Sequence, residues 1–257
     1  MQTLENFIES NRLVLPVREK AFCKELWKEN AVPKTDYWYT QFFEIIGKEG
    51  TSALLRDVNK YNYLAYKSYL GSKRHLDVGS GTGLASLYIH INSRNPVEML
   101  DVYDNDIAEE VKLEMMEDKN FHFTLYGQGD KVPFEDQSFD SASLFYVLHH
   151  CENRDVSLRL LKDIRRILQK GSYLIVIEEP VVSVPDRERL DHLDKLINSY
   201  YASSGFDRGL GFDIANFYTK PELEDQFAAA GFAMVHRLEN LEWSWLLPRS
   251  LYILSNE

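Results

Sequence analysis

Two hydrophobic patterns divide the chain near residue 72. Residues 1–72 carry apolar side chains at spacings of three and four, the period of amphipathic helices. Residues 73–257 alternate short apolar runs with segments of helical period, which predicts parallel strands linked by helices. We therefore expect a helical N-terminal extension that serves as a lid, followed by an α/β domain. Helices of the extension are predicted at 17–30, 36–48 and 51–70.

The α/β pattern predicts a core of buried strands. The run YLIVI at 173–177 is apolar throughout, as expected of a strand covered on both faces. Gly171 follows the amphipathic segment 155–169, and a helix C-terminus favours glycine there. Residues 181–218 break the alternation and are expected to form an insertion. The last two strands are short and adjacent, which favours an antiparallel pair at the sheet edge. Strands are predicted at 74–78, 97–102, 121–126, 139–148, 173–177, 232–239 and 250–254, and helices at 82–92, 106–117, 155–169 and 221–232.

Composition and charge narrow the classes of protein. Hydrophobic residues make up 44% and charged residues 27% of the 257 residues, which excludes a largely disordered chain and a bare coiled coil. The net charge of -11 makes nucleic acid a less favourable partner than a small molecule or a protein. Cys23 and Cys151 lack the spacing of a disulfide framework or a zinc site. No signal peptide and no bilayer-spanning run is visible, so we expect a cytoplasmic protein without membrane contact. The pattern does not indicate an oligomeric state.

The segment HLDVGSGTG at 75–83 contains the most informative motif. A predicted strand runs into Gly79, Gly81 and Gly83, and a predicted helix follows at once. Glycines at such a turn let the backbone approach a ligand, and the helix N-terminus offers free N–H groups. The spacing from Gly79 is G-x-G-x-G, which differs from the dinucleotide pattern. Asp77 precedes the glycines; its charge is unfavourable beside a pyrophosphate and favourable beside an ammonium group. A tight turn without a ligand is the alternative.

With this motif the sequence resembles the class I S-adenosylmethionine-dependent methyltransferases, of the small-molecule, methyltransferase-11-like type. Asp101 ends the second predicted strand, where that family has an acidic residue. Further stretches match in order, although Gln169 and Ser172 depart from the common Pro-Gly-Gly version of one of them. The matching stretches are GDKVPFEDQSFDSASLFYVLHH at 129–150, RRILQKGSYLIVIEEP at 165–180 and YTKPELEDQFAAAGF at 218–232.

The resemblance covers roughly residues 73–180 and 217–254 and implies a fold and a cofactor. The implied fold is α/β, a Rossmann-like, doubly wound, seven-stranded, mostly parallel sheet with the last strand inserted antiparallel. The implied cofactor is S-adenosyl-L-methionine, bound at the C-terminal ends of the first strands. The general rule for open α/β sheets favours the same place.

The resemblance also implies roles for individual residues. Asp77, Gly79 and Gly81 would hold the methionine end of the cofactor, Asp101 the ribose and Asp130 the adenine amine. Asp104 competes with Asp101 for the ribose, and Asp101 is alternatively a cap for the helix that begins near residue 106. Asp130 is alternatively a solvated turn residue. Apolar neighbours such as Leu84, Val102 and Val132 would cover the base. The remaining residues expected at the cofactor are Ser80 and Lys131.

Methyl transfer requires an acceptor held in line with the methyl group, and a neutral amine or phenol also needs a base. His149 and His150 end the fourth predicted strand, on the side of the expected crevice, and either is a candidate base. Glu178 and Glu179 end the fifth and are candidates for contact with the acceptor. The alternatives are a packed loop histidine and a buried carboxylate held by backbone amides. No metal is expected, because the acidic stretch at 101–106 is explained by a ribose site and a helix cap.

We therefore expect methyl transfer to a small-molecule acceptor. A protein or RNA methyltransferase is one alternative, and the negative charge argues weakly against RNA. A cofactor-binding but non-catalytic partner or regulatory module is another. A nicotinamide-dependent oxidoreductase is the third, and the glycine spacing argues against it.

Overall fold

The computed structural model describes residues 62–104, 107–127, 129–181, 187, 216–239 and 249–257. Most of the predicted N-terminal extension and of the insertion at about 181–218 lies outside these residues. Of the third predicted helix, residues 62–66 are helical, and the 3-10 turn η1 (Lys67–Tyr69) follows them. None of the helices in the described ranges has the length and apolar character needed to cross a membrane.

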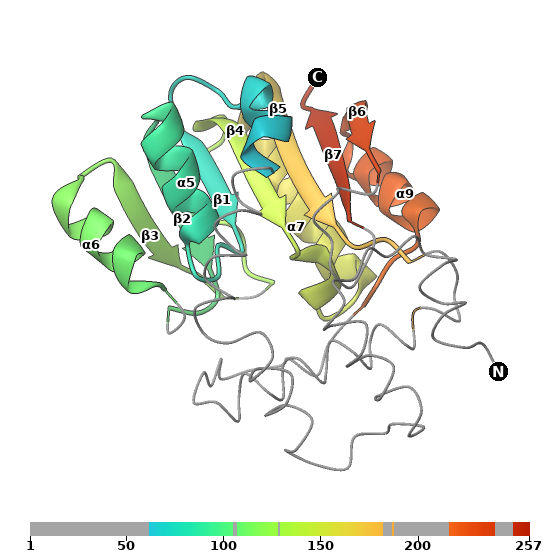
Figure 1. Ribbon diagram of the computed structural model, residues 1–257. Coiled ribbons are helices and arrows are strands. Elements are labelled where there is room, and N and C mark those ends of the chain that lie inside the picture. The colour runs from blue at the N-terminus through green and yellow to red at the C-terminus, as the bar shows by residue number, and fades with distance from the viewer. Residues whose placement is uncertain (1–61, 105–106, 128, 182–186, 188–215, 240–248) are drawn as a thin grey trace, which may run out of the picture.

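Seven strands form one sheet in the order β3-β2-β1-β4-β5-β7-β6 (Figure 1). The pairs among β1 to β5 are parallel, while β7 is antiparallel to both β5 and β6. The predicted sheet and its antiparallel edge pair are thus confirmed. The strands are β1 (His75–Val78), β2 (Val97–Asp101), β3 (Phe121–Leu125), β4 (Phe139–Phe145), β5 (Leu168–Glu178), β6 (Ala233–Leu238) and β7 (Ser250–Ser255).

Helices cover both faces of the sheet, as a doubly wound topology requires (Figure 1). One apolar core joins the sheet to α7 and α9 through residues such as Ile164 and Phe227. A second core joins it to α5 and α6 through Ile89 and Val111. The helices are α5 (Leu84–Ser93), α6 (Glu109–Glu117), α7 (Arg154–Ile167) and α9 (Lys220–Ala230), and a second 3-10 turn is η2 (Leu148–His150).

Local sequence fixes the ends of the two helices on the α7 face. Asn153 caps α7 by accepting hydrogen bonds from the backbone N–H groups of Asp155 and Val156. Thr219 and Glu222 form a capping box at the start of α9, and Gly231 ends that helix with a φ of 89°. These caps satisfy the backbone groups that a helix leaves unpaired at its ends.

The prediction that Gly171 ends a helix was wrong. The helix α7 ends at Ile167, and Leu168 is already extended and paired with Phe139 in the sheet. Gly171 lies inside β5 with a φ of 77°, and its N–H donates to the carbonyl of Asn256 at 2.7 Å. Glycine adopts this positive φ within the strand without strain, near the register shift of the β4–β5 pair.

The fourth strand is shorter than predicted. It ends at Phe145, and Tyr146 then takes a φ of 60° before η2 begins. The backbone N–H groups of Val147 and Leu148 donate to Glu178 at 2.9 and 2.7 Å instead of to a neighbouring strand. A buried carboxylate thus turns the chain out of the sheet at this point.

Candidate functional site

The glycine turn lies where β1 passes into α5. Gly79, Gly81 and Gly83 have φ of 69°, 52° and 74°, which only glycine adopts without strain. A Cβ on Gly79 would lie 2.3 Å from Val147, and one on Gly83 would lie 2.8 Å from Val111. Packing therefore explains these two glycines. Among the described residues, no heavy atom apart from those of its chain neighbours lies within 4 Å of the Cβ position of Gly81, so this glycine borders open space that a ligand could enter.

Ser80, beside Gly81, also supports the interpretation that a ligand binds at this turn. Its hydroxyl oxygen is buried, and it has no hydrogen-bond partner among the described residues. Buried polar atoms are nearly always satisfied in a folded protein. A bound polar group at this turn would supply the partner, which fits a cofactor held at the predicted position.

Asp101 connects the end of β2 to the glycine turn. Its Oδ2 accepts the N–H of Gly81 at 2.7 Å, and its Oδ1 accepts the N–H groups of Val102 at 2.7 Å and Tyr103 at 3.3 Å. The residue is 8% exposed. The helix α6 begins at Glu109 with Ala108 as its N-cap, and among the described residues no hydrogen bond of Asp101 to the first turn of this helix is seen. Asp104, the competitor, is exposed.

Asp77 is a buried carboxylate at the end of β1. It is 2% exposed and accepts hydrogen bonds from the hydroxyls of Ser86 and Ser143. Burial raises the pKa of Asp77 to about 6. His75 hydrogen-bonds to Ser143 at 2.9 Å from the other side, and burial lowers the pKa of His75 to about 3. This chain of groups thus contains a carboxylate and a neutral imidazole, which favours the approach of a cation to Asp77.

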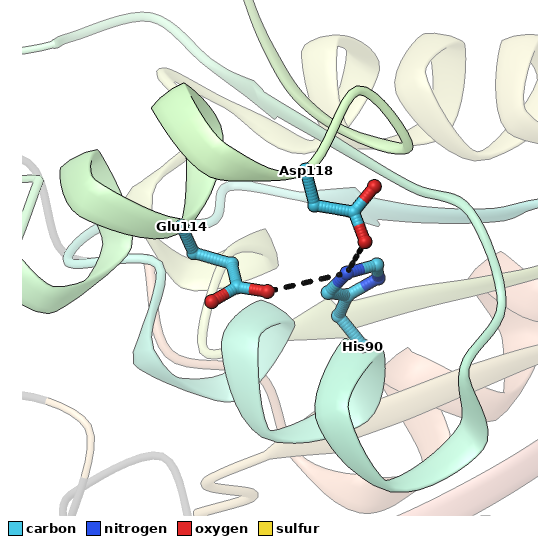
Figure 2. Close-up of side chains that lie close together, drawn as sticks. All are labelled: His90, Glu114 and Asp118. Carbon is cyan, nitrogen blue, oxygen red and sulfur yellow. Dashed lines mark hydrogen bonds and ion pairs between the residues drawn. The ribbon is translucent and has the colours of Figure 1, made fainter.

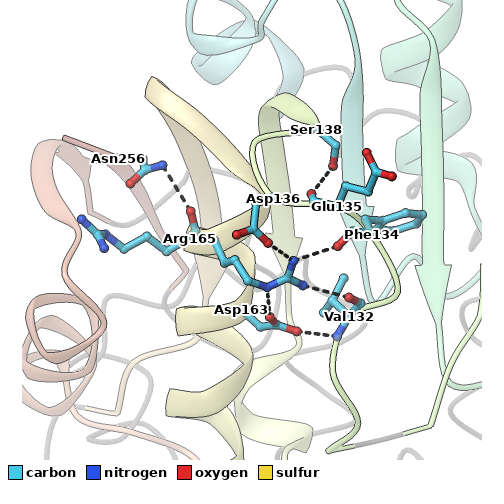
Figure 3. Close-up of polar contacts among 9 residues, drawn as sticks. Val132, Phe134, Glu135, Asp136, Ser138, Asp163, Arg165 and Asn256 are labelled. Atoms are coloured by element: carbon cyan, nitrogen blue, oxygen red, sulfur yellow. Dashed lines mark hydrogen bonds and ion pairs between the residues drawn. The ribbon is translucent and has the colours of Figure 1, made fainter.

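A second polar network holds the predicted adenine segment against α7 (Figure 3). The guanidinium of Arg166 donates to the carbonyls of Val132 at 2.9 Å and Phe134 at 2.8 Å. It also pairs with Asp163 at 2.6 Å and Asp136 at 2.7 Å. The carboxylate of Asp163 in turn accepts the N–H of Val132. The segment is therefore fixed in position by side chains of α7.

Asp130, the predicted adenine residue, and Lys131, the cofactor residue predicted beside it, project from this segment. Asp130 and Lys131 are exposed, whereas Val132 beside them is 1% exposed. The N–H of Asp130 donates to the carbonyl of Gly127 at 3.0 Å, as in a turn. Exposure is compatible with both the adenine role and the solvated turn for Asp130.

The predicted acceptor-side residues meet at the ends of β4 and β5. Besides holding two backbone amides, Glu178 lies 2.8 Å from Nδ1 of His149. The imidazole of His149 is 3% exposed and stacks on Phe217 at a centroid distance of 4.9 Å. His150 is partly exposed, with its ring 4.1 Å from that of His149. The geometry favours a structural role for Glu178 and His149 and leaves His150 as the more accessible imidazole.

The sequence analysis did not single out Tyr146 and Arg249, which lie at the same edge of the sheet. Arg249 precedes β7, and its guanidinium lies 4.6 Å from the ring centre of Tyr146. Its Nε donates to Glu179 at 3.0 Å in a partly buried ion pair. Burial raises the pKa of Tyr146 to about 12, so its hydroxyl stays protonated at neutral pH. No local signal reveals this group, because Arg249 and Glu179 are 70 residues apart.

The structure brings the two predicted halves of the site together. Gly79 donates to the carbonyl of Leu100 at 2.7 Å, which joins β1 to β2 beside Asp101. The side chain of Val147 fills the position of a Cβ on Gly79, and its backbone N–H is held by Glu178. The cofactor-side and acceptor-side residues therefore lie at one edge of the sheet, at the C-terminal ends of its parallel strands.

Comparison with known proteins gives matches at the level of sequence family and of fold. A family model described as a methyltransferase domain matches residues 48–237. The sterol 4-C-methyltransferase strm-1 of Caenorhabditis elegans is 30% identical over 112 residues, which cover 44% of this chain and 30% of that protein. The match thus spans about a third of that relative's length.

Solved structures share the fold. One is a SAM-dependent methyltransferase from Methanosarcina mazei, with a TM-score of 0.55, 18% identity, and coverage of 75% of this chain and 97% of the other. Another is a putative O-methyltransferase from Nostoc punctiforme, with a TM-score of 0.59, 15% identity, and coverage of 93% of this chain and 68% of the other. At these identities the likeness shows the fold alone.

Proposed function

The chain belongs to the class I S-adenosylmethionine-dependent methyltransferase family, and on that premise we propose that it transfers a methyl group from S-adenosylmethionine to a small-molecule acceptor. The observation that supports this most directly is the meeting of Asp77, Gly81 and Asp101 at the ends of β1 and β2. When bound there, the cofactor supplies a methyl group on a sulfonium, which an acceptor takes by in-line displacement.

Several residues in and around the glycine turn have a role in this proposal. The carboxylate of Asp77 balances the ammonium group of the methionine end. The open backbone at Gly81 admits the ligand, and Ser80 supplies its buried hydroxyl. Asp101 accepts ribose hydroxyls in addition to amide N–H groups, because a carboxylate has about four acceptor sites. We assign the adenine to Asp130 and Lys131, with Val102 against the base.

The acceptor occupies the side of the crevice formed by η2 and the end of β5. Where the acceptor is a neutral amine or hydroxyl, we propose that His150, the more accessible imidazole of the pair, acts as the base that takes its proton. His149 and Glu178 position the backbone of η2 around it. The name of the curated relative describes methyl transfer to a sterol, so a largely apolar acceptor of that kind is the first class to screen.

The test is calorimetric titration of the full chain with S-adenosylmethionine and S-adenosylhomocysteine. Asp101→Asn removes the carboxylate at the end of β2, and Asp104→Asn is the matched control, since it removes an exposed carboxylate three residues away. We expect micromolar binding of both ligands by the wild type and by Asp104→Asn, and at least tenfold weaker binding by Asp101→Asn, on the basis of a lost charge-assisted hydrogen bond of roughly 1.5–3 kcal/mol.

The outcomes separate the alternatives. Absence of binding to the wild type contradicts the proposal. Binding without methyl transfer from labelled cofactor to any sterol, amine or phenol in a screen leaves the non-catalytic module as the function. Transfer to protein or RNA, and not to small molecules, makes those the acceptor class.

A further inference from the structure

A histidine and two carboxylates meet between α5 and α6, away from the glycine turn (Figure 2). His90 lies in the last turn of α5, Glu114 in α6, and Asp118 is the C-cap of α6. Their ligand atoms all lie within 4.8 Å of one another. Nε2 of His90 is 3.1 Å from Oδ2 of Asp118 and 3.6 Å from Oε1 of Glu114.

Contacts with neighbouring residues fix the orientation of the His90 and Asp118 side chains. Nδ1 of His90 lies 2.8 Å from the carbonyl of Asn95, which only accepts, so Nδ1 carries the hydrogen. Nε2 is then the ring nitrogen that faces both carboxylates. The ring also stacks on Phe121 at 4.9 Å. Oδ1 of Asp118 accepts the N–H of Asn120 at 2.7 Å, which turns Oδ2 toward the imidazole. Such second contacts are typical of metal-binding histidines and carboxylates.

When Nε2 carries no proton, three acceptor atoms face one another, and either a proton on Nε2 or a metal ion between them relieves their repulsion. A proton on Nε2 satisfies Asp118 at 3.1 Å, but Glu114 at 3.6 Å is beyond hydrogen-bond distance. A tetrahedral zinc ion with bonds of about 2.0–2.1 Å holds its ligand atoms about 3.3 Å apart, close to both distances. Imidazole and carboxylate are ligands that zinc accepts.

We propose that His90, Glu114 and Asp118 bind a divalent transition-metal ion, with zinc as the best match, and that this ion ties α5 to α6. The fourth position is left to water. Because α6 leads through Asp118 into β3, the ion would also fix the turn before that strand. The site is independent of the methyl-transfer proposal, since none of its ligands belongs to the cofactor site.

The test uses the full chain with any affinity tag removed. Zinc chloride is titrated by calorimetry, and cobalt chloride is followed by its visible absorption, which reports tetrahedral coordination. Glu114→Gln removes one ligand from a partly exposed position, so the variant is expected to fold. Glu117→Gln makes the same charge change at an exposed position of the same helix. Thermal unfolding without metal checks that both variants are folded.

We expect one zinc ion per chain, tetrahedral cobalt bands, and a rise in melting temperature with zinc. Substituting a residue that only supports a metal ligand typically weakens metal binding by roughly 10- to 100-fold. Glu114→Gln removes a ligand itself and should weaken zinc binding by more than that, whereas Glu117→Gln should leave it unchanged. Absence of zinc binding, or zinc binding that both variants retain equally, overturns the proposal and assigns the cluster to an ion pair of a protonated histidine.

Discussion

At the scale of single residues, the buried carboxylate of Asp77 lowers the stability of the fold and has a proposed role in binding the cofactor. Its folded-state pKa of about 6 exceeds the ordinary value of 3.8, so the folded chain binds more protons than the unfolded chain between these pH values. The free energy of unfolding therefore falls as the pH rises from about 4 to 6. Above that range the ionised carboxylate costs the fold on the order of 3 kcal/mol. A cofactor ammonium group would offset this cost.

We predict that Asp77→Asn removes this pH dependence. The variant should match or exceed the wild type in free energy of unfolding at pH 7, because the amide still exchanges hydrogen bonds with Ser86 and Ser143. Its affinity for S-adenosylmethionine should fall, while wild-type affinity should weaken as the pH drops below about 6. Urea unfolding and calorimetry across pH measure both quantities. A variant that keeps wild-type affinity contradicts the role proposed for Asp77.

Glu178 provides a second prediction at this scale. Glu178→Gln should lower the free energy of unfolding by about 1–3 kcal/mol, because a buried group that accepts two amides and faces His149 loses its charge. Glu152→Gln, at an exposed position, is the control. Denaturant unfolding makes the comparison. Unchanged stability together with a large loss of turnover would instead favour the contact with the acceptor that the sequence suggested.

At the scale of elements, the glycines of the turn differ in what they permit: Gly79 and Gly83 allow close packing, whereas Gly81 borders open space. We predict that Gly81→Ala folds, loses about 1 kcal/mol of stability through its positive φ, and binds S-adenosylmethionine more weakly because the new methyl group enters the open space. Gly171→Ala is the matched control, with a φ of 77° and open space at a position in β5. Equal affinity in the two variants, measured by calorimetry, would show that the turn does not contact the cofactor.

The contact of α7 with the adenine segment gives the next prediction. Arg166→Gln removes the bonds to the carbonyls of Val132 and Phe134, so the segment loses its support from the helix. We expect a roughly tenfold rise in the dissociation constant for S-adenosylmethionine, equal to about 1.4 kcal/mol. Arg159→Gln, exposed on the same helix, should have no effect. A dissociation constant that Arg166→Gln leaves unchanged would place the adenine elsewhere.

At the scale of the whole molecule, the sheet could be predicted because its signals are local. Each apolar run and each helical period lies within about a dozen residues, and the glycine turn marks the first crossover. The resemblance supplied the order of the strands. Asp101 stood out because it ends a buried run beside that turn.

The features that the sequence did not reveal depend on distant pairs. The positive φ of Tyr146 follows from Glu178, about 30 residues later, which takes the next amides. Gly171 was misassigned because its partner, the carbonyl of Asn256, lies in the last residues of the sequence. His90 and Asp118 are 28 residues apart, and only the packing of α5 against α6 brings them together. In each case the chemistry is set by tertiary contacts.

The position of β7 between β5 and β6 has a consequence for biosynthesis. During translation β6 emerges before β7, yet in the sheet β6 pairs only with β7. The edge of β5, which includes the fully buried Ile175 and Ile177, therefore stays open until residues 250–255 have left the ribosome. An open apolar strand edge is a template for pairing with another chain. A ribosome that stalls before residues 250–255 have emerged thus holds a nascent chain in which the β7-side edge of β5 is still unpaired.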